Sequence, residues 1–306
     1  MNTTLIQQLT VTEKLASTGR WKRMMNDPYK YLTAILHRRM VYPITKQHIQ
    51  RKAKLFFEKD MTVALPSSSD IYLTGGKSDD SEIRLARYMI LNLQAGDHFL
   101  DVGAHFGYYT LLGLELVGRE GSVFAYEPSE SFDLLKKNTQ GLGNVVARKQ
   151  AISENPGVVT IYEFSNLYSE FNTIDISQFA NEPWLQGAAP RAVQVASDTI
   201  DAVVGERNFM PTFIKIDVEG AEDKVIAGGM NFFEKHSPVI AMEFLADQKI
   251  NFAHRKADSL LRQCNYKPYS IEGSGKLTAI IDVGEYLRNS GLRSDNIIYQ
   301  KQPAAL

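Results

Sequence analysis

The segment that most constrains this chain is 98–110, His-Phe-Leu-Asp-Val-Gly-Ala-His-Phe-Gly-Tyr-Tyr-Thr. Its apolar start predicts a short buried strand, its two glycines a tight turn, and its end the first turn of a helix. Asp101 stands at the tip of the strand, and Gly103 and Gly107 bracket the turn, so a ligand can approach bare backbone there. A strand–turn–helix with an acid at the strand tip is typical of a cofactor site in an open α/β sheet.

Downstream of this segment, short apolar runs alternate with amphipathic stretches, which predict strands and helices in turn. This alternation predicts an α/β fold, a doubly wound and mostly parallel sheet with helices on both faces. The expected strands are 98–102, 122–126, 144–152, 157–163, 211–218, 239–244 and 295–301. The expected helices are 81–93, 108–117, 129–139, 199–204, 221–227 and 256–265, and 164–197 is expected to be irregular.

The first 60 residues are strongly basic, with 12 Lys and Arg against 4 Asp and Glu, although the whole chain has a net charge of −1. The sequence predicts helices over 29–40 and 46–57, on either side of Pro43. We therefore divide the chain into a basic, mainly helical N-terminal arm, 1–78, and a main domain, 79–306.

The arm has several conceivable partners. Its charge could bind an anionic partner, namely nucleic acid, an acidic glycan or a membrane surface. The alternative, which we favour, is that the arm packs on its own acidic body or on a second subunit. We therefore expect no nucleic acid partner, and we keep a homodimer through the arm open.

Composition indicates an ordinary globular protein, with 44% hydrophobic and 23% charged residues. The single cysteine, Cys264, excludes a disulfide within the chain and fits a reducing compartment. The N-terminus lacks the basic and apolar regions of a secretory signal. No stretch approaches the ~18 apolar residues of a membrane span. We therefore expect a cytoplasmic protein without a transmembrane segment.

The residues that follow the expected strands are acidic or polar, with no Lys or Arg among them. Since ligands in such sheets bind outside the carboxyl ends of the strands, these side chains should face one site. The glycine spacing matches neither the G-x-G-x-x-G dinucleotide fingerprint nor a P-loop, and carboxylates repel phosphate. The site therefore suits a cofactor with a positive group and a ribose but no phosphate, and S-adenosylmethionine fits. The residues concerned are Asp101, Glu127, Gln150, Ala151, Asp217, Glu219, Glu222 and Glu243.

Two of these acids have specific expected roles. Asp101 would accept a hydrogen bond from the methionine ammonium, directly or through water. Glu127 would accept both ribose hydroxyls, because an ionised carboxylate is an acceptor with two oxygens. The alternatives are that Asp101 caps the helix and that Glu127 is a solvated loop acid. Their positions on successive strand tips favour the binding roles.

Four stretches together resemble the motif series of FkbM-type, class I S-adenosylmethionine-dependent methyltransferases. They are Asp101–Thr110, Glu127-Pro128, Thr199-Ile-Asp201 and Lys215-Ile-Asp-Val-Glu-Gly-Ala-Glu222. The resemblance covers roughly residues 80–300, and His105 stands where the wider class has its middle glycine. It implies a Rossmann-like methyltransferase sheet and an O-methyltransferase that acts on a hydroxyl of a sugar, glycan or natural product. The alternative function is a non-catalytic S-adenosylmethionine-binding or anionic-partner-binding protein on the same fold.

The expected contacts of the cofactor follow the same motifs. They are Asp101, Gly103, Ala104, Gly107, Tyr109, Thr110, Glu127, Pro128, Gln150, Ala151 and Asp217.

A hydroxyl acceptor must lose its proton, so the site needs a base within hydrogen-bond reach. The candidates are His105, Asp217, Glu219 and Glu243. His105 has a suitable unperturbed pKa, but a loop histidine bonded to backbone is the rival interpretation. The alternatives for Asp217 and Glu243 are a helix cap and a buried structural acid.

The polar segment 164–173 has interleaved aromatics and could form the acceptor wall, with Ser169, Glu170 and Asn172 as contacts. An ordinary surface insertion is the alternative. We expect no metal site, because the histidines show no ligand spacing with Cys or carboxylate. The acidic ring could still recruit Mg²⁺.

Overall fold

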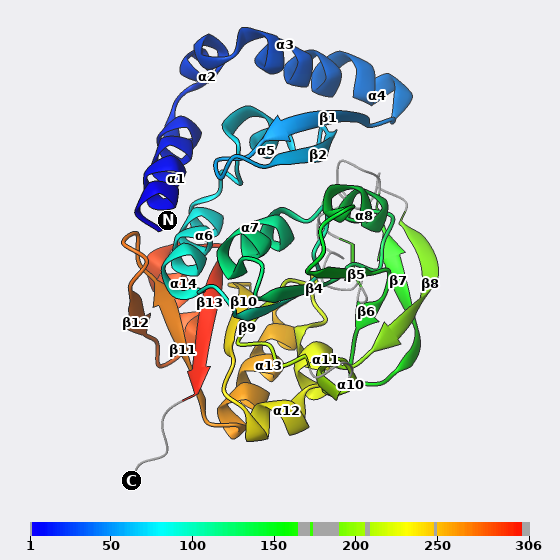
Figure 1. Cartoon of the computed structure of the whole chain (residues 1–306), viewed down its shortest axis with the longest axis vertical. Coiled ribbons are helices and arrows are strands. Elements are labelled where there is room, and N and C mark those ends of the chain that lie inside the picture. Colours follow the sequence, from blue (N-terminus) through cyan, green and yellow to red (C-terminus); the bar gives the residue numbers. More distant parts are fainter. Residues whose placement is uncertain (1, 165–171, 174–189, 206–208, 248–249, 302–306) are drawn as a thin grey trace.

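An eight-stranded mixed sheet lies at the centre of the protein (Figure 1). The computed structural model describes residues 2–164, 172–173, 190–205, 209–247 and 250–301. The strand order in the sheet is β12-β11-β13-β10-β9-β3-β4-β5. These strands are β3 (His98–Val102), β4 (Ser122–Tyr126), β5 (Val145–Arg148), β9 (Phe213–Ile216), β10 (Val239–Leu245), β11 (Tyr266–Ile271), β12 (Leu277–Ala279) and β13 (Ser294–Lys301).

The parallel part of this sheet confirms the doubly wound fold. β10, β9, β3, β4 and β5 are parallel, whereas β13, β11 and β12 add an antiparallel edge. β13 is the expected strand 295–301, but the sequence did not predict β11, β12 or the antiparallel direction. The chain runs outward from β3 to β4 and β5, then returns to β9 and β10 on the other side of β3. This reversal places a topological switch point between β3 and β9, where open α/β sheets bind ligands.

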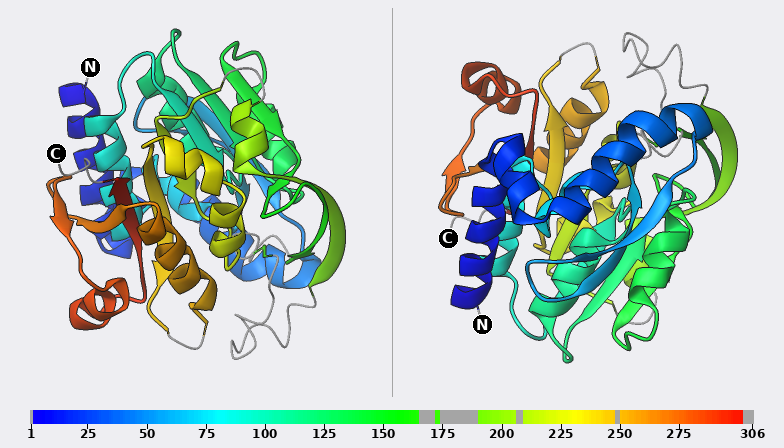
Figure 2. Two further views of the ribbon diagram at one scale, coloured as in Figure 1. Left: turned by 90° about the horizontal axis from the view of Figure 1, so that it is seen from below. Right: turned by 90° about the horizontal axis from the view of Figure 1, so that it is seen from above.

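Both faces of the sheet are buried, as expected for a parallel sheet. Along β3, Phe99 joins the apolar cluster under the helices of one face, and its neighbour Leu100 joins the cluster of the other face. The two views of Figure 2 show helices in front of the sheet from above and from below. The first face carries α6 (Asp80–Asn92), α7 (Tyr108–Val117) and α8 (Phe132–Thr139). The second carries α10 (Ile200–Gly205), α11 (Glu222–Ala227), α12 (Met230–Lys235), α13 (Phe252–Gln263) and α14 (Val283–Ser290).

A smaller sheet stands beside the central one, with the order β6-β8-β7. The expected strand 144–152 is therefore two strands, β5 and β6 (Ala151–Ile152), which belong to different sheets. β7 (Gly157–Glu163) matches its predicted bounds. β8 (Arg191–Asp198) lies in a stretch expected to be irregular, because Val193 and Val195 are its only large apolar residues and its apolar signal is weak.

The N-terminal arm is mainly helical, but it also contains a hairpin. Its helices are α1 (Asn2–Ser17), α2 (Arg20–Asn26), α3 (Pro28–Leu36), the π-helix η1 (His37–Val41), α4 (Tyr42–Thr45) and α5 (Ser69–Thr74). The predicted helix 46–57 is wrong, because β1 (Ile49–Lys54) pairs there with β2 (Asp60–Leu65). The buried, apolar β2 supplies a full ladder of partners, and this pairing overrides the local helical pattern.

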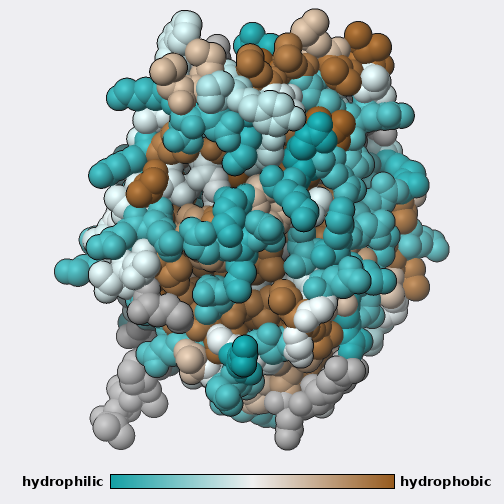
Figure 3. Space-filling view, turned by 45° about the horizontal axis from the view of Figure 1, so that its top comes forward, coloured by the Kyte–Doolittle hydropathy of each residue, from teal (hydrophilic) through white to brown (hydrophobic). Residues whose placement is uncertain are grey.

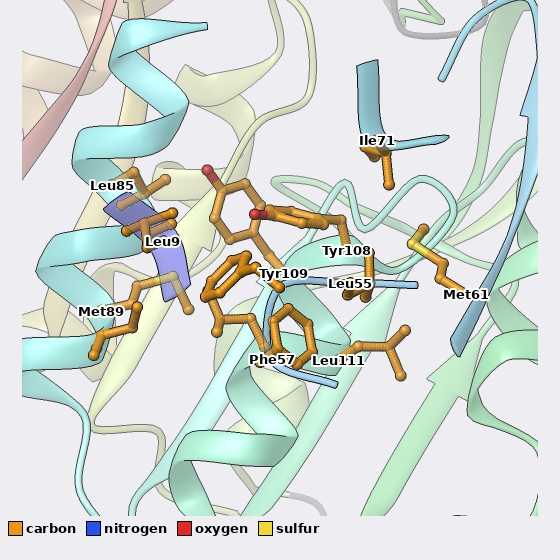
Figure 4. Packing of buried hydrophobic residues seen from close by; sticks show 14 of the residues in the cluster. Leu9, Leu55, Phe57, Met61, Ile71, Leu85, Met89, Tyr108, Tyr109 and Leu111 are labelled. Atoms are coloured by element: carbon orange, nitrogen blue, oxygen red, sulfur yellow. The ribbon is translucent and has the colours of Figure 1, made fainter. Parts of the chain in front are cut away.

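The arm and the main domain share one apolar cluster. Figure 4 shows Leu9 of α1 beside Leu85 of α6, and Leu55 of the hairpin beside Tyr108 of α7, and all four belong to this cluster. The boundary between 78 and 79 stays a prediction. No helix in the described parts of the chain combines the length and apolar character needed to cross a bilayer.

Candidate active site

A cavity of about 300 Å³ opens at the carboxyl ends of the parallel strands, beside the switch point. Residues that follow β3, β4 and β9 line one side, together with β6 and Glu243 of β10. The predicted site residues that line it are Gly103, His105, Glu127, Pro128, Gln150, Ala151, Asn172, Asp217, Glu219 and Glu243. Ten residues predicted from strand tips and from the 164–173 segment therefore face one space.

The glycine turn after β3 is pressed against the chain that follows β9. Gly103 has a φ of +79°, and a Cβ at this position would lie 1.8 Å from the carbonyl oxygen of Asp217. The Gly103 and Ala104 N–H groups both donate to the Tyr126 carbonyl at 3.0 Å, which ties the turn to the tip of β4. Glycine is therefore required at 103 by conformation and by space.

His105 has a φ of +49°, the left-handed conformation that explains why the wider class has glycine here. Its backbone N–H donates to Glu127 Oε2 at 2.8 Å, and its ring stacks on Phe106 with centroids 3.7 Å apart. Burial, and then the charge of Lys77, lower the pKa of the His105 imidazole to about 3. The ring is therefore neutral at physiological pH and a weak base, contrary to the expectation from its unperturbed pKa.

Glu127 is buried, and both of its carboxylate oxygens accept hydrogen bonds from nearby residues. Oε1 accepts from the backbone N–H of Ser129 at 3.0 Å and from the Ser129 hydroxyl, and Oε2 accepts from His105. Burial raises the pKa of this carboxyl, and the three donors oppose that rise. Because each carboxylate oxygen can accept more than one hydrogen bond, the fixed group keeps acceptor capacity toward the cavity.

Asp101 lies deeper than the sequence suggested. It is fully buried, and its Oδ2 accepts from the Thr110 hydroxyl at 2.6 Å. Its Oδ1 has no hydrogen-bond partner in the described structure, and Lys215 Nζ stands 4.0 Å away. Burial raises the pKa of Asp101, and Lys215 opposes the rise. Asp101 is thus an acid beneath the turn rather than on the cavity wall.

Three carboxylates meet in the cavity. One oxygen from each of Asp217, Glu219 and Glu243 lies within 4.8 Å of the others. Burial, and then the neighbouring Asp217, raise the pKa of Glu243 to about 8. Burial also favours the neutral form of Asp217, but Lys215 at 3.0 Å and Lys77 lower its pKa overall. Two adjacent acids with opposite pKa shifts are an arrangement suited to proton transfer. The oxygen spacing would also accommodate a divalent cation.

The remaining predicted residues occupy three different places. Ala104 and Tyr109 line an adjoining cavity of about 30 Å³, room for one water, and the Tyr109 hydroxyl donates to Glu82 Oε2 at 2.6 Å. Gly107 begins α7, and Thr110 holds Asp101; neither lines a cavity within the described residues. Ser169 and Glu170 lie outside the described residues.

One wall of the cavity was missed by the sequence analysis. It comes from α5, the connection to α6, the first turn of α6 and the start of β13, namely Asp70, Lys77, Asp79, Ser81, Glu82, Ser294 and Asn296. Lys77 corrects the expectation of a site without basic residues; it pairs with Glu82 at 3.1 Å. The dense run of polar residues 77–82 before an amphipathic helix was the available signal, whereas β13 offered none.

A family model described as the methyltransferase FkbM domain matches residues 101–268, more than half of the chain. The chain belongs to the FkbM methyltransferase family. The match confirms the resemblance drawn from the motifs, and it supports S-adenosylmethionine as the cofactor.

Solved structures with a similar arrangement include other methyltransferases. One is the FkbM methyltransferase from Methylobacillus flagellatus, at 15% identity and a TM-score of 0.43 over 76% of this chain. Another is the S-adenosylmethionine-dependent O-methyltransferase from Thermotoga maritima, at 14% identity and a TM-score of 0.38 over 73% of this chain. The chain spans 52% and 66% of the lengths of these two proteins. A search of curated proteins found no match.

Proposed function

We propose that this FkbM protein is a cytoplasmic O-methyltransferase that methylates a hydroxyl of a sugar, glycan or natural product. The observation that carries the proposal is that one cavity joins two different sets of residues. One set is the glycine turn with Glu127, and the other is the carboxylate cluster Asp217, Glu219 and Glu243.

The residues of the first set fit the cofactor. Glu127 has fixed oxygens, and after the three donors from Ser129 and His105 it keeps about one acceptor position, on Oε2, for a ribose hydroxyl. The buried Asp101 lies beneath the turn, and its Oδ1, which makes no hydrogen bond within the described residues, would accept from the ammonium of the methionine part through water. Gln150 and Ala151 line the same side of the cavity. When bound, the cofactor supplies an electrophilic methyl group.

We assign Glu243 as the general base for the acceptor hydroxyl. Its raised pKa of about 8 lies nearer to physiological pH than the pKa of about 3 of His105, and efficient bases have a pKa near the working pH. Asp217 stays ionised beside it, so a proton taken from the acceptor is favoured on Glu243. His105, neutral in the turn, has a positioning role through its N–H bond to Glu127.

The acceptor side of the cavity supports a hydroxyl-rich acceptor. Its wall combines Asn296 and Ser294 with the carboxylates Asp79 and Glu82. Such groups exchange hydrogen bonds with several hydroxyls at once. Phosphorylated or sulfated acceptors would meet mainly negative charge and should be poor substrates.

The test is turnover of S-adenosylmethionine to S-adenosylhomocysteine in the presence of a panel of neutral sugars, glycosides and phenolic alcohols. Wild-type protein should release S-adenosylhomocysteine with at least one acceptor, and Glu243→Gln should lower kcat at least 100-fold, the size of a general-base contribution. Glu120→Gln, an exposed acid in the loop before β4, is the matched control and should leave kcat unchanged.

Two other outcomes would change the assignment. Thermal stabilisation by S-adenosylhomocysteine without turnover on any acceptor would favour the non-catalytic binding protein. Loss of activity with EDTA and recovery with Mg²⁺ would mean that the three carboxylates hold a cation instead of supplying a base. The proposal predicts full activity in EDTA.

A further inference from the structure

An apolar stripe runs along the outer side of the arm, over α2, α3, η1 and α4. It consists of large side chains spaced by three or four residues, each half or more exposed: Trp21, Met25, Tyr29, Leu32, Leu36, Met40 and Ile44. The exposure reaches 77% at Trp21 and 84% at Ile44. Figure 3 shows apolar side chains gathered along the upper edge of the molecule, the end at which Figure 1 draws these helices. A contiguous exposed apolar surface of this kind marks an interaction site.

The opposite side of these helices is anchored to the body. Ala34, His37 and Tyr42 are buried, and α3 packs on α5. The ammonium of Lys30 lies 5.8 Å from the centre of the Tyr72 ring. The helices are therefore held by one side while the apolar stripe faces outward.

Positive charge surrounds the apolar stripe. Residues 20–54 contain ten Lys and Arg and one acid, Asp27. Asp27 caps α3 by accepting from the Lys30 N–H at 3.0 Å, and its carboxylate lies 3.6 Å from Lys30 Nζ, so its charge is already compensated. The exposed basic side chains along these helices are Lys22, Arg38, Arg39 and Lys46.

We propose that the apolar stripe and its basic flanks dock the protein on the surface of an anionic lipid bilayer. Amphipathic helices that lie in a membrane interface combine an apolar face with Lys and Arg, and Trp and Tyr favour the headgroup level. The apolar side chains would enter the acyl boundary, while Arg38, Arg39 and Lys22 would meet lipid phosphates. This attachment is peripheral and requires no membrane-spanning helix.

Charge and polarity favour this partner over two others. Two copies of segment 20–54 facing each other would bring ten basic residues against ten, with one acid on each side. Nucleic acid would satisfy the charges, but it would leave Leu32, Leu36 and Ile44 in water. A bilayer with anionic headgroups satisfies both the charges and the apolar side chains.

The experiment is co-sedimentation of the full chain with vesicles, without cofactor or acceptor, so that its result is independent of the proposed methyl transfer. Vesicles of phosphatidylcholine with about a third phosphatidylglycerol are compared with phosphatidylcholine alone. We expect binding to the anionic vesicles, weak binding to the neutral ones, and a loss of binding at high salt.

Two variants test the two components separately. Trp21→Ser with Leu36→Ser and Ile44→Ser removes apolar contacts, and Arg38→Glu with Arg39→Glu reverses charge. Each should weaken vesicle binding at least tenfold, since one basic residue near the surface contributes about fivefold. All five positions are exposed, so the far-ultraviolet circular dichroism of both variants should match that of the wild type.

The matched control is Ile281→Ser with Lys267→Glu. Both positions are exposed and lie outside the arm, and binding should be unchanged. In a Trp184→Phe background, Trp21 becomes the single tryptophan, and its emission should shift to shorter wavelength with anionic vesicles.

Three results would overturn the proposal. The first is absence of wild-type binding to anionic vesicles. The second is a dimer in analytical ultracentrifugation that the serine variant abolishes while vesicle binding is absent, which would assign the apolar stripe to a second copy. The third is tight RNA or DNA binding that the serine variant leaves intact, together with no vesicle binding.

Discussion

Replacement of Glu243 by glutamine should stabilise the protein at alkaline pH. Below pH 4.5 the carboxyl is protonated in the folded and in the unfolded chain, so it has no effect on stability. As the pH rises from 4.5 toward 8, the unfolded chain ionises while the folded chain holds the proton, and the free energy of unfolding falls. Glutamine carries no charge and avoids this loss.

The magnitude follows from the raised pKa. At about 1.4 kcal/mol for each tenfold change in proton affinity, a rise from 4.5 to about 8 lowers the free energy of unfolding by at most about 5 kcal/mol above pH 8. Solvent reaches the half-buried Glu243 side chain and screens the charge of Asp217, so we expect the free energy of unfolding to fall by about 2 kcal/mol.

The assay is urea unfolding, followed by circular dichroism at pH 5.5 and pH 8.5 without cofactor. The free energy of unfolding of Glu243→Gln should exceed that of the wild type by about 2 kcal/mol at pH 8.5, and this difference should shrink toward pH 5.5. The exposed control Glu120→Gln should change neither value. Equal stability of Glu243→Gln and wild type at pH 8.5 would refute the reasoning, because it would show an ordinary carboxyl pKa and remove the argument for Glu243 as the base.

Two further substitutions test the packing around the site. Gly103→Ala should lower the free energy of unfolding by about 3 kcal/mol or more in chemical denaturation, since it adds a Cβ 1.8 Å from the Asp217 carbonyl oxygen. Gly141 has a similar φ of +80°, and a Cβ added there would meet nothing within 4 Å, so Gly141→Ala should lower the free energy of unfolding by only about 1 kcal/mol. Equal losses of stability in the two variants would contradict the steric argument. Asp295→Asn should lower the free energy of unfolding by about 3 kcal/mol, and the melting temperature with it, because it removes the buried charge that pairs with Arg84 at 3.0 Å. Asp80→Asn, which removes the exposed partner of the same Arg84, should lower the free energy of unfolding by less than about 1 kcal/mol. A larger loss of stability from Asp80→Asn than from Asp295→Asn would show that Asp295 is not the main partner of Arg84.

The central strands could be predicted from the sequence because their signals are local. β3, α7, β4 and β7 have the bounds that the apolar runs and turn residues predicted. Strand tips then identified Glu127, Asp217 and Glu243, because parallel strands end at one edge of the sheet. In a parallel sheet, residues that are far apart in the sequence therefore lie together in one site.

Features that depend on distant contacts could not be predicted. The hairpin of the arm forms because β2 pairs with 49–54, which a local helical pattern cannot reveal. Asp101 looked like a ligand-facing acid, but the fold buries it against Thr110 and Lys215. The pKa of His105 depends on burial and on Lys77, which lies outside the motif.

The central claim is that the cavity beside the switch point holds the cofactor through Glu127, and calorimetric titration with S-adenosylhomocysteine tests it most directly. We expect Glu127→Ala to weaken binding at least tenfold, since it removes the acceptor for a ribose hydroxyl and the acceptor that holds the His105 N–H. Glu120→Ala, at the other end of β4, should bind as the wild type does. Equal affinity of Glu127→Ala and wild type would contradict the claim and place the cofactor elsewhere.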